Sequence, residues 1–157
     1  MVCFTIFVFL ENMTTNLHEY IANKIEEKIK YFNSLIEDLR ASNNDTKSSM
    51  GDKYETSREM MQQEITRIQN QLNEVLVQQE QFLKLAVKEH DVVVNGSYVE
   101  TTMGNFVIAC SLGEINFQDK KIFVLSNQTP LSKVLSGKKV GDNFEMNGKN
   151  FKISLVN

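Results

Sequence analysis

The chain has 157 residues, a formal net charge of −3 and 41% hydrophobic residues, which fits one ordinary domain or two small ones. This composition excludes a disordered chain, and the small charge argues against electrostatic binding of nucleic acid over a whole face. The two cysteines, Cys3 and Cys110, make no metal-ligand spacing and no disulfide framework. A reduced, cytoplasmic location is therefore the default expectation, with Cys110 as a buried, inert thiol.

Residues 2–10 form an apolar run at the start of the chain. The run is too short to cross a bilayer as a helix, which needs about 20 residues. It also lacks the basic leading region and cleavage site of a signal peptide. Met13 follows, with helix-capping residues at 14–16, so residues 1–12 are interpreted as an over-extended start or a loosely attached tail. A weak membrane-surface anchor is the minority alternative, and we expect no membrane partner.

Two long helices are predicted between residues 13 and 90. Apolar residues recur at steps of three and four over residues 17–39 and again over residues 61–86, which is typical of helices with one buried stripe. The second helix is predicted to run from about residue 52 to residue 88. The first stripe is Leu17, Ile21, Ile25, Ile29, Phe32, Ile36 and Leu39. The second is Met61, Ile65, Ile68, Leu72, Val75, Gln79, Phe82 and Ala86, of which Gln79 is the one polar member. A polar break at 41–47 separates the stripes, which predicts an antiparallel coiled-coil hairpin.

A small β-rich domain is predicted for residues 91–157, so the chain as a whole is predicted to be an α+β protein. Short runs of β-forming residues alternate with turn residues such as Asn95-Gly96 and Asn147-Gly148. The predicted strands are 92–94, 97–101, 105–110, 114–117, 121–125, 143–146 and 151–155. One short helix interrupts them, with Thr129 as its N-cap, Pro130 as its first residue and Gly137 as its stop.

The run Gly137-Lys138-Lys139-Val140-Gly141-Asp142, preceded by Pro130-Leu131, resembles the C-terminal domain of the Gre-type (GreA/GreB-like) bacterial transcript cleavage factors. These transcription elongation factors also carry a helical hairpin ahead of that domain. The resemblance covers residues 91–157 by motif and the hairpin by architecture. It implies an FKBP-like fold for the C-terminal domain.

The predicted hairpin tip adds a second match, because the family's Gly-Asp-x-x-Glu pattern stands here as Gly51-Asp52-Lys53-Tyr54-Glu55. The resemblance implies that the arm enters the secondary channel of RNA polymerase. Asp52 would be the main ligand of a Mg²⁺ ion shared with the polymerase, and Glu55 would help to place the metal or a water near the nascent RNA 3′ end. The sequence departs from the family at Lys53-Tyr54, where Leu-Ser is usual, and again after Glu55.

The residues themselves leave a structural alternative open at each of these positions. Asp52 and Glu55 also form a capping arrangement, with Asp52 as N-cap and Glu55 at the third helical position. Lys53, Tyr54 and Arg58 are candidates for contact with RNA or channel walls, or are exposed tip residues of no special role. Lys138 and Lys139 are candidates for contact with the polymerase rim, or form a solvated basic turn.

Three functions follow as hypotheses. The first is a monomeric accessory factor that binds RNA polymerase and stimulates the polymerase's own cleavage of backtracked RNA, without being an enzyme alone. The second is a Gre-like regulator that occupies the same channel without inducing cleavage, because its tip has diverged. The third and weakest is an FKBP-type peptidyl-prolyl isomerase. A shared fold does not by itself carry function, and the chain has no Trp, the residue that often forms the base of the active-site pocket in such isomerases.

Overall fold

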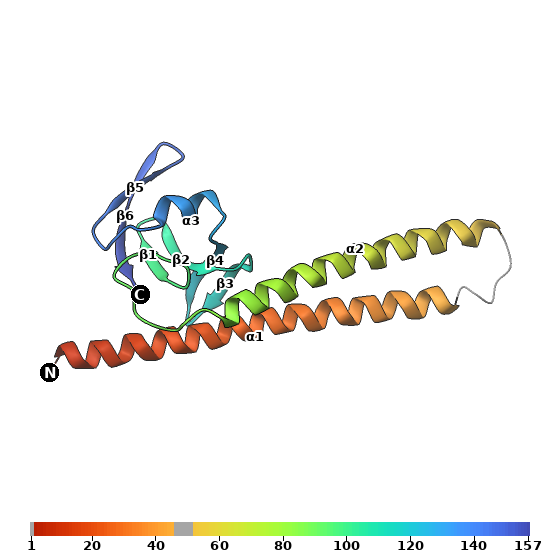
Figure 1. Ribbon diagram of the computed structural model, residues 1–157, viewed down its shortest axis with the longest axis horizontal. Coiled ribbons are helices and arrows are strands. Elements are labelled where there is room, and N and C mark those ends of the chain that lie inside the picture. The colour runs from red at the N-terminus through yellow and green to blue at the C-terminus, as the bar shows by residue number, and fades with distance from the viewer. Residues whose placement is uncertain (1, 46–51) are drawn as a thin grey trace. The chain divides into compact units, whose positions relative to one another are not determined.

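The structure is a computed structural model that describes the backbone of residues 2–45 and 52–157 and the side chains of residues 15–42 and 55–157. An N-terminal helical hairpin is followed by a domain with a six-stranded sheet (Figure 1). Residues 23–79 form one compact unit, which we call the hairpin unit. Residues 1–22 and 80–157 form the other, which we call the sheet unit. The predicted domain boundaries after residues 12 and 90 stay predictions.

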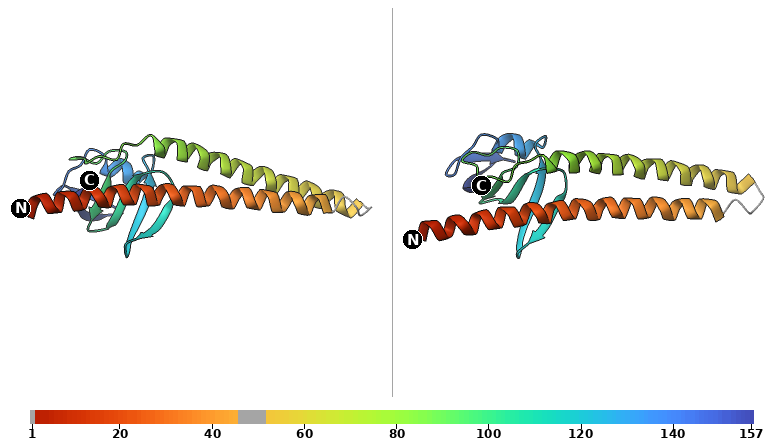
Figure 2. Two further views of the ribbon diagram at one scale, coloured as in Figure 1. Left: turned by 90° about the horizontal axis from the view of Figure 1, so that it is seen from below. Right: turned by 60° about the horizontal axis from the view of Figure 1, so that its bottom comes forward.

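The hairpin unit consists of parts of two long helices, α1 (Val2–Asp45) and α2 (Asp52–Leu83), which lie side by side in the views of Figure 2. Ile36 of α1 packs against Ile65 and Ile68 of α2, as the three-four spacing predicts. Phe32, Leu35, Leu39 and Leu72 pack around this cluster. The seam of the predicted coiled coil is thus confirmed over its middle turns.

Both helices differ in length from the predicted ranges. Helix α1 begins at Val2 rather than near residue 17 and continues to Asp45 through the predicted break, because no Pro or Gly interrupts residues 2–45. Helix α2 ends at Leu83, five residues before the predicted end. There Leu85 donates a backbone hydrogen bond to Phe82 at 3.0 Å, which tightens the last turn and ends the helix.

Replacing Ile68 by Ala should weaken the hairpin unit by about 2 kcal/mol, the low end for a buried Ile, because a two-helix seam relaxes more easily than a closed core. The Ile68 side chain is 1% exposed. Val77→Ala is the matched control on the same helix, since that β-branched side chain is 52% exposed. Urea unfolding followed by circular dichroism at the helical band measures the difference. Equal midpoints for the two variants would contradict the seam.

The sheet unit holds six strands in the order β3-β4-β2-β1-β6-β5. Their bounds are β1 Tyr98–Thr101, β2 Gly104–Ala109, β3 Gly113–Phe117, β4 Lys120–Ser126, β5 Asn143–Met146 and β6 Lys149–Val156. Strands β2 and β4 pair in parallel, and all other neighbours are antiparallel. Six of the seven predicted strands are confirmed, and so is the β5–β6 hairpin, whose turn residue Asn147 has φ 53°.

The predicted strand at residues 92–94 is wrong. This apolar segment is irregular, and it holds Val93 in the core by two backbone hydrogen bonds. Val93 donates to the carbonyl of Lys138 at 2.9 Å, and its own carbonyl accepts from Gly137 at 2.8 Å. The backbone groups of this segment are therefore satisfied by a turn rather than by a strand partner.

The short helix α3 (Pro130–Leu135) is confirmed with its predicted cap. The Thr129 hydroxyl accepts from the backbone N–H of Ser132 at 3.2 Å, and Pro130 fills the first position, where no N–H donor is needed. Leu131 and Leu135 point from α3 into the core of the sheet unit. That core is Val93, Val99, Phe106, Ile108, Leu131, Leu135, Phe144 and Ile153.

Candidate functional site

Helix α2 begins at Asp52, and Glu55 stands three residues later in its first turn. This spacing puts the two carboxyl-bearing residues on one face of the helix. The Glu55 side chain is exposed. Of the predicted site, Gly51 and the side chains of Asp52, Lys53 and Tyr54 lie outside the described residues.

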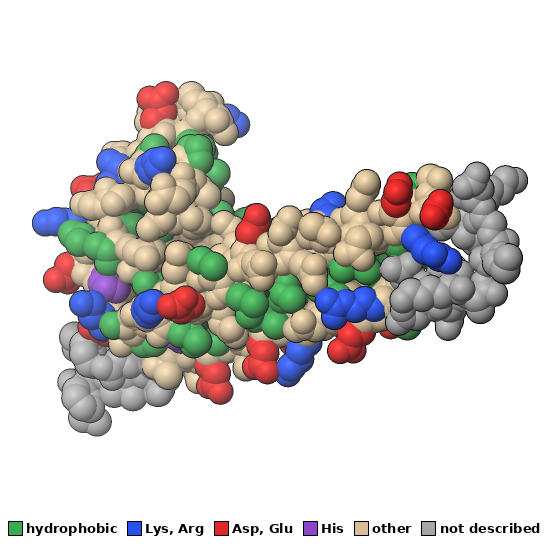
Figure 3. All heavy atoms as spheres, turned by 45° about the vertical axis from the view of Figure 1, so that its right-hand side comes forward, with side chains coloured by type: hydrophobic (Ala, Val, Ile, Leu, Met, Phe, Trp, Pro, Cys, Tyr) green, Lys and Arg blue, Asp and Glu red, His purple; other side chains and the backbone are tan. Residues whose placement is uncertain are grey.

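Arg58 and Glu59 follow on the next turn of α2, where Glu59 is exposed and Arg58 is half-buried. Further along the helix, charged residues one turn apart form exposed ion pairs, such as the pair of Arg67 and Glu64. On the face of the molecule shown in Figure 3, acidic and basic side chains alternate along the helices. Such alternation provides no broad basic surface for nucleic acid on that face.

Carboxylate oxygens are the ligands that Mg²⁺ prefers, so Asp52 and Glu55 have the right chemistry for this ion. Mg²⁺ takes six ligands, and two carboxylates supply only part of that shell. No group of three or more His, Cys, Asp or Glu residues that could hold a metal occurs among the described residues. Two carboxylates are thus too few to complete the shell of a Mg²⁺ ion by themselves.

Lys138 and Lys139 lie in the turn after α3 and belong to the sheet unit, whereas the tip residues belong to the hairpin unit. The backbone of this turn is fixed by its own hydrogen bonds. Lys138 donates to the Leu135 carbonyl at 3.1 Å, and Lys139 donates to the Asp142 carboxylate at 2.8 Å. Gly137 and Gly141 have φ of 76° and 92°, which only glycine adopts readily. The family-like motif is therefore a rigid turn whose Lys139 side chain is exposed.

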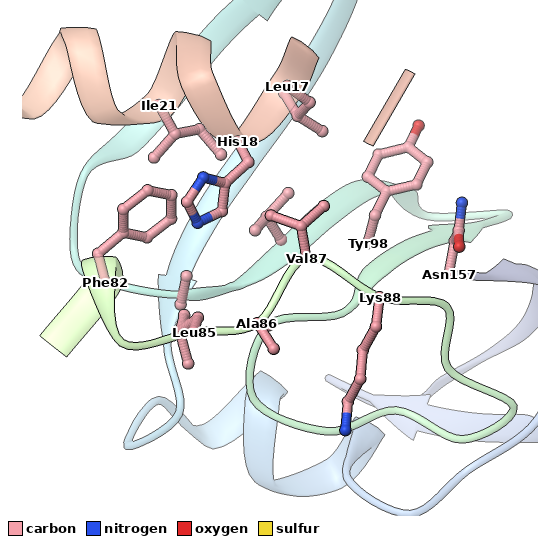
Figure 4. A pocket seen from close by; sticks show the side chains of 13 residues that line it. Leu17, His18, Ile21, Phe82, Leu85, Ala86, Val87, Lys88, Tyr98 and Asn157 are labelled. Carbon is pink, nitrogen blue, oxygen red and sulfur yellow. The ribbon is translucent and has the colours of Figure 1, made fainter. Parts of the chain in front are cut away.

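A small cavity in the sheet unit was not predicted from the sequence. Its volume is about 30 Å³, and it lies where α1, the segment after α2 and the sheet meet. Residues lining it include Leu17, His18, Ile21, Phe82, Tyr98, Val107 and Asn157. The ring of His18 stacks on Phe82, with centroids 4.3 Å apart, as Figure 4 shows. No sequence signal links these residues, because they are up to 140 positions apart.

Burial lowers the pKa of His18 below its ordinary value of 6.5, although a hydrogen bond to the Phe82 backbone opposes this effect. The pKa of His90 is also lowered, first by burial and then by the charge of Lys88. Tyr98, beside the same cavity, donates a 2.7 Å hydrogen bond to Glu100. Burial first, and then this bond, raise the pKa of Tyr98. The cavity therefore favours a neutral imidazole and a neutral phenol.

Acidification through pH 6.5 should destabilise the sheet unit. Below that pH the unfolded chain binds protons at His18 and His90 before the folded chain does, so the free energy of unfolding falls until the lowered folded pKa values are passed. Chemical denaturation at several pH values measures this slope. His18→Phe and His90→Phe should each reduce it. An unchanged slope in both variants would contradict the assignment.

Comparison with solved structures finds structures of proteins named Gfh1. The structure of the transcription factor Gfh1 matches with 16% identity and a TM-score of 0.35, covering 86% of this chain and 92% of its own. GreA factor homolog 1 (Gfh1) of Thermus thermophilus matches with 16% identity and a TM-score of 0.36, covering 87% of this chain and 94% of its own. Gfh1 of Thermus aquaticus matches with 16% identity and a TM-score of 0.33, covering 85% of this chain and 92% of its own. No family model and no curated protein matches the sequence. TM-scores below 0.5 do not establish a common fold.

A search for membrane spans among the described helices finds none that is both long and apolar enough to cross a bilayer.

Proposed function

We propose that this protein is a Gre-type accessory factor of RNA polymerase that stimulates the cleavage of backtracked RNA by the polymerase's own active site. The observation that carries the proposal is the position of the two acids: Asp52 opens the second helix of a hairpin, and Glu55 is exposed in the same turn. The family-like turn at residues 137–142, which the structure holds in a fixed conformation, supports it.

In this proposal the hairpin unit brings Asp52 and Glu55 to a catalytic centre built by the polymerase. Asp52 would supply one oxygen ligand to a Mg²⁺ ion, and Glu55 would help to position the metal or a water through its carboxylate. When bound, Mg²⁺ supplies stabilisation of charge and a water with a lowered pKa. Neither acid performs chemistry without the partner, so the protein is an accessory factor rather than an enzyme.

The remaining predicted contacts are assigned to partner binding. Lys53, Tyr54 and Arg58 would contact the channel wall or the nascent RNA 3′ end, and Lys138 with Lys139 would meet the polymerase rim. The factor would act in the cytoplasm as a monomer. Replacing any one of these five residues by Ala should weaken binding to the polymerase and leave the fold of the protein intact.

A second function, regulation of transcription without RNA cleavage, is supported by one residue of the predicted tip. Lys53 places a positive charge between the two acids in the sequence, where the family has an uncharged residue. A cation beside the acids competes with a metal ion for them. The protein would then occupy the polymerase channel and regulate transcription without inducing cleavage.

The test uses the full chain and purified RNA polymerase stalled in a backtracked complex with end-labelled RNA. Binding is measured by co-sedimentation, and cleavage by the appearance of shortened RNA. Binding with faster cleavage supports the first function, and binding without faster cleavage supports the second. Failure to bind polymerase overturns both.

A further inference from the structure

The cavity in the sheet unit carries unused hydrogen-bonding groups. Two nitrogens that line it, Nε2 of His18 and Nδ2 of Asn157, are buried and have no hydrogen-bond partner among the described residues. Asn157 is only 5% exposed. Buried polar groups in folded proteins are nearly always paired with protein or with ordered water, so both nitrogens require a partner.

The two nitrogens have complementary chemistry. The Phe82 backbone raises the pKa of His18 through a hydrogen bond, which is the effect of a carbonyl on a donating ring N–H. Because Nε2 has no partner, we assign this donor to the other ring nitrogen, which makes Nε2 the acceptor of the neutral ring. The amide Nδ2 of Asn157 is a donor. A molecule that both donates and accepts hydrogen bonds, and that carries no charge, satisfies either position. Most of the rest of the lining, such as Leu17, Ile21 and Val107, is apolar, and its one charged side chain is Lys88. An apolar lining favours a neutral guest over an ion.

The volume of the cavity decides which neutral molecule fits. A buried water needs roughly 10–15 Å³ of such space, whereas pockets for small organic ligands enclose roughly 300 Å³ or more. The volume of about 30 Å³ therefore accommodates two waters. Figure 4 shows His18 and Asn157 among the side chains that line the cavity, with Tyr98 between them in this view.

We propose that this cavity is a binding site for two ordered water molecules, one donating to Nε2 of His18 and one accepting from Nδ2 of Asn157. The two waters complete the polar contacts at the point where α1 meets the sheet. This inference is independent of the proposed function, because it concerns the sheet unit alone.

Two neighbouring valines provide a matched pair for the test. Val107 of β2 and Val124 of β4 are partners in the parallel register, and both are buried. Val107 lines the cavity, and Val124 does not. The added methyl group of Val107→Ile is expected to take the space of a water, whereas Val124→Ile adds the same group at a buried position that does not line the cavity.

A crystal structure of the full chain at a resolution that shows waters should contain one water within hydrogen-bonding distance of each nitrogen. Oxygen-17 magnetic relaxation dispersion counts long-lived buried waters in solution, and this count should fall by at least one in Val107→Ile and stay unchanged in Val124→Ile. Density at neither nitrogen, density of a larger molecule, or equal counts in the two variants would overturn the proposal. The crystal structure of the unaltered protein decides the matter even if a variant fails to fold.

Discussion

Replacing Asp52 by Asn should reduce the stimulation of RNA cleavage at least about tenfold, a typical loss when a group that supports a metal is removed. The substitution removes the negative charge of the proposed metal ligand and keeps its size. Asp52 is the first residue of helix α2, where loss of an acid's favourable interaction with the helix dipole costs only about 0.3–1 kcal/mol, so the start of the helix should be preserved. The rate of RNA shortening in backtracked polymerase complexes measures the effect, and co-sedimentation shows whether binding persists.

Two controls separate this loss from a general effect of charge. Asp38→Asn changes an exposed acid on helix α1 and should leave stimulation unchanged. Glu59→Gln, one turn beyond Glu55, should have far less effect than Glu55→Gln, because Glu59 stands outside the Asp-x-x-Glu pair. Full stimulation by Asp52→Asn, in a protein that still binds polymerase, would contradict the assigned role of the acid. Equal losses in all four variants would show that charge alone matters.

Periodicity predicted those parts of the fold in which each helix or strand buries a regular stripe. The steps of three and four brought Ile36 against Ile65 and Ile68, and the Thr129-Pro130 cap set the start of α3. Both signals are local, because neighbouring residues on one helix face share one environment. The strands after residue 97 were predicted for the same reason.

Long-range packing was not visible in the sequence. Val93 lies in an apolar run that resembles a strand, but its backbone is bound by Gly137 and Lys138, more than 40 residues away. Helix α2 stops at Leu83, where Leu85 donates its backbone hydrogen bond to Phe82, although the stripe itself continues to Ala86. The residues that follow, Leu85 and Ala86, line the cavity beside the sheet. Propensity is a weak prior where tertiary contacts compete with it.

For the candidate site, too, the sequence predicted the local arrangement but not what depends on distant segments or on other molecules. The spacing of Asp52 and Glu55 predicted one shared helix face, because both lie in the first turn of α2. The role of that face depends on ligands that another molecule supplies, which no pattern within this chain encodes. The cavity around His18 escaped prediction for a different reason: its lining comes from α1, the end of α2, the sheet and the last residue of the chain.

Replacing Phe82 by Ala should lower the free energy of unfolding of the sheet unit by about 3–5 kcal/mol, as for other buried aromatic residues. The side chain is 2% exposed, and its ring stacks on His18, so truncation removes buried area and enlarges a cavity that already exists. Leu83→Ala is the control, because the next side chain is 62% exposed and should cost little. Urea unfolding of the full chain measures both.

The same pair of variants tests the environment of His18 independently of stability. Desolvation is the main cause of the lowered His18 pKa, and Phe82 covers one face of the imidazole ring. Truncating Phe82 admits water to that face, so the pKa should rise toward 6.5 in Phe82→Ala and stay low in Leu83→Ala. A titration of the His18 ring by NMR distinguishes these outcomes. If Phe82→Ala changes neither the free energy of unfolding nor the His18 pKa, the packing of α1 against the end of α2 is wrong.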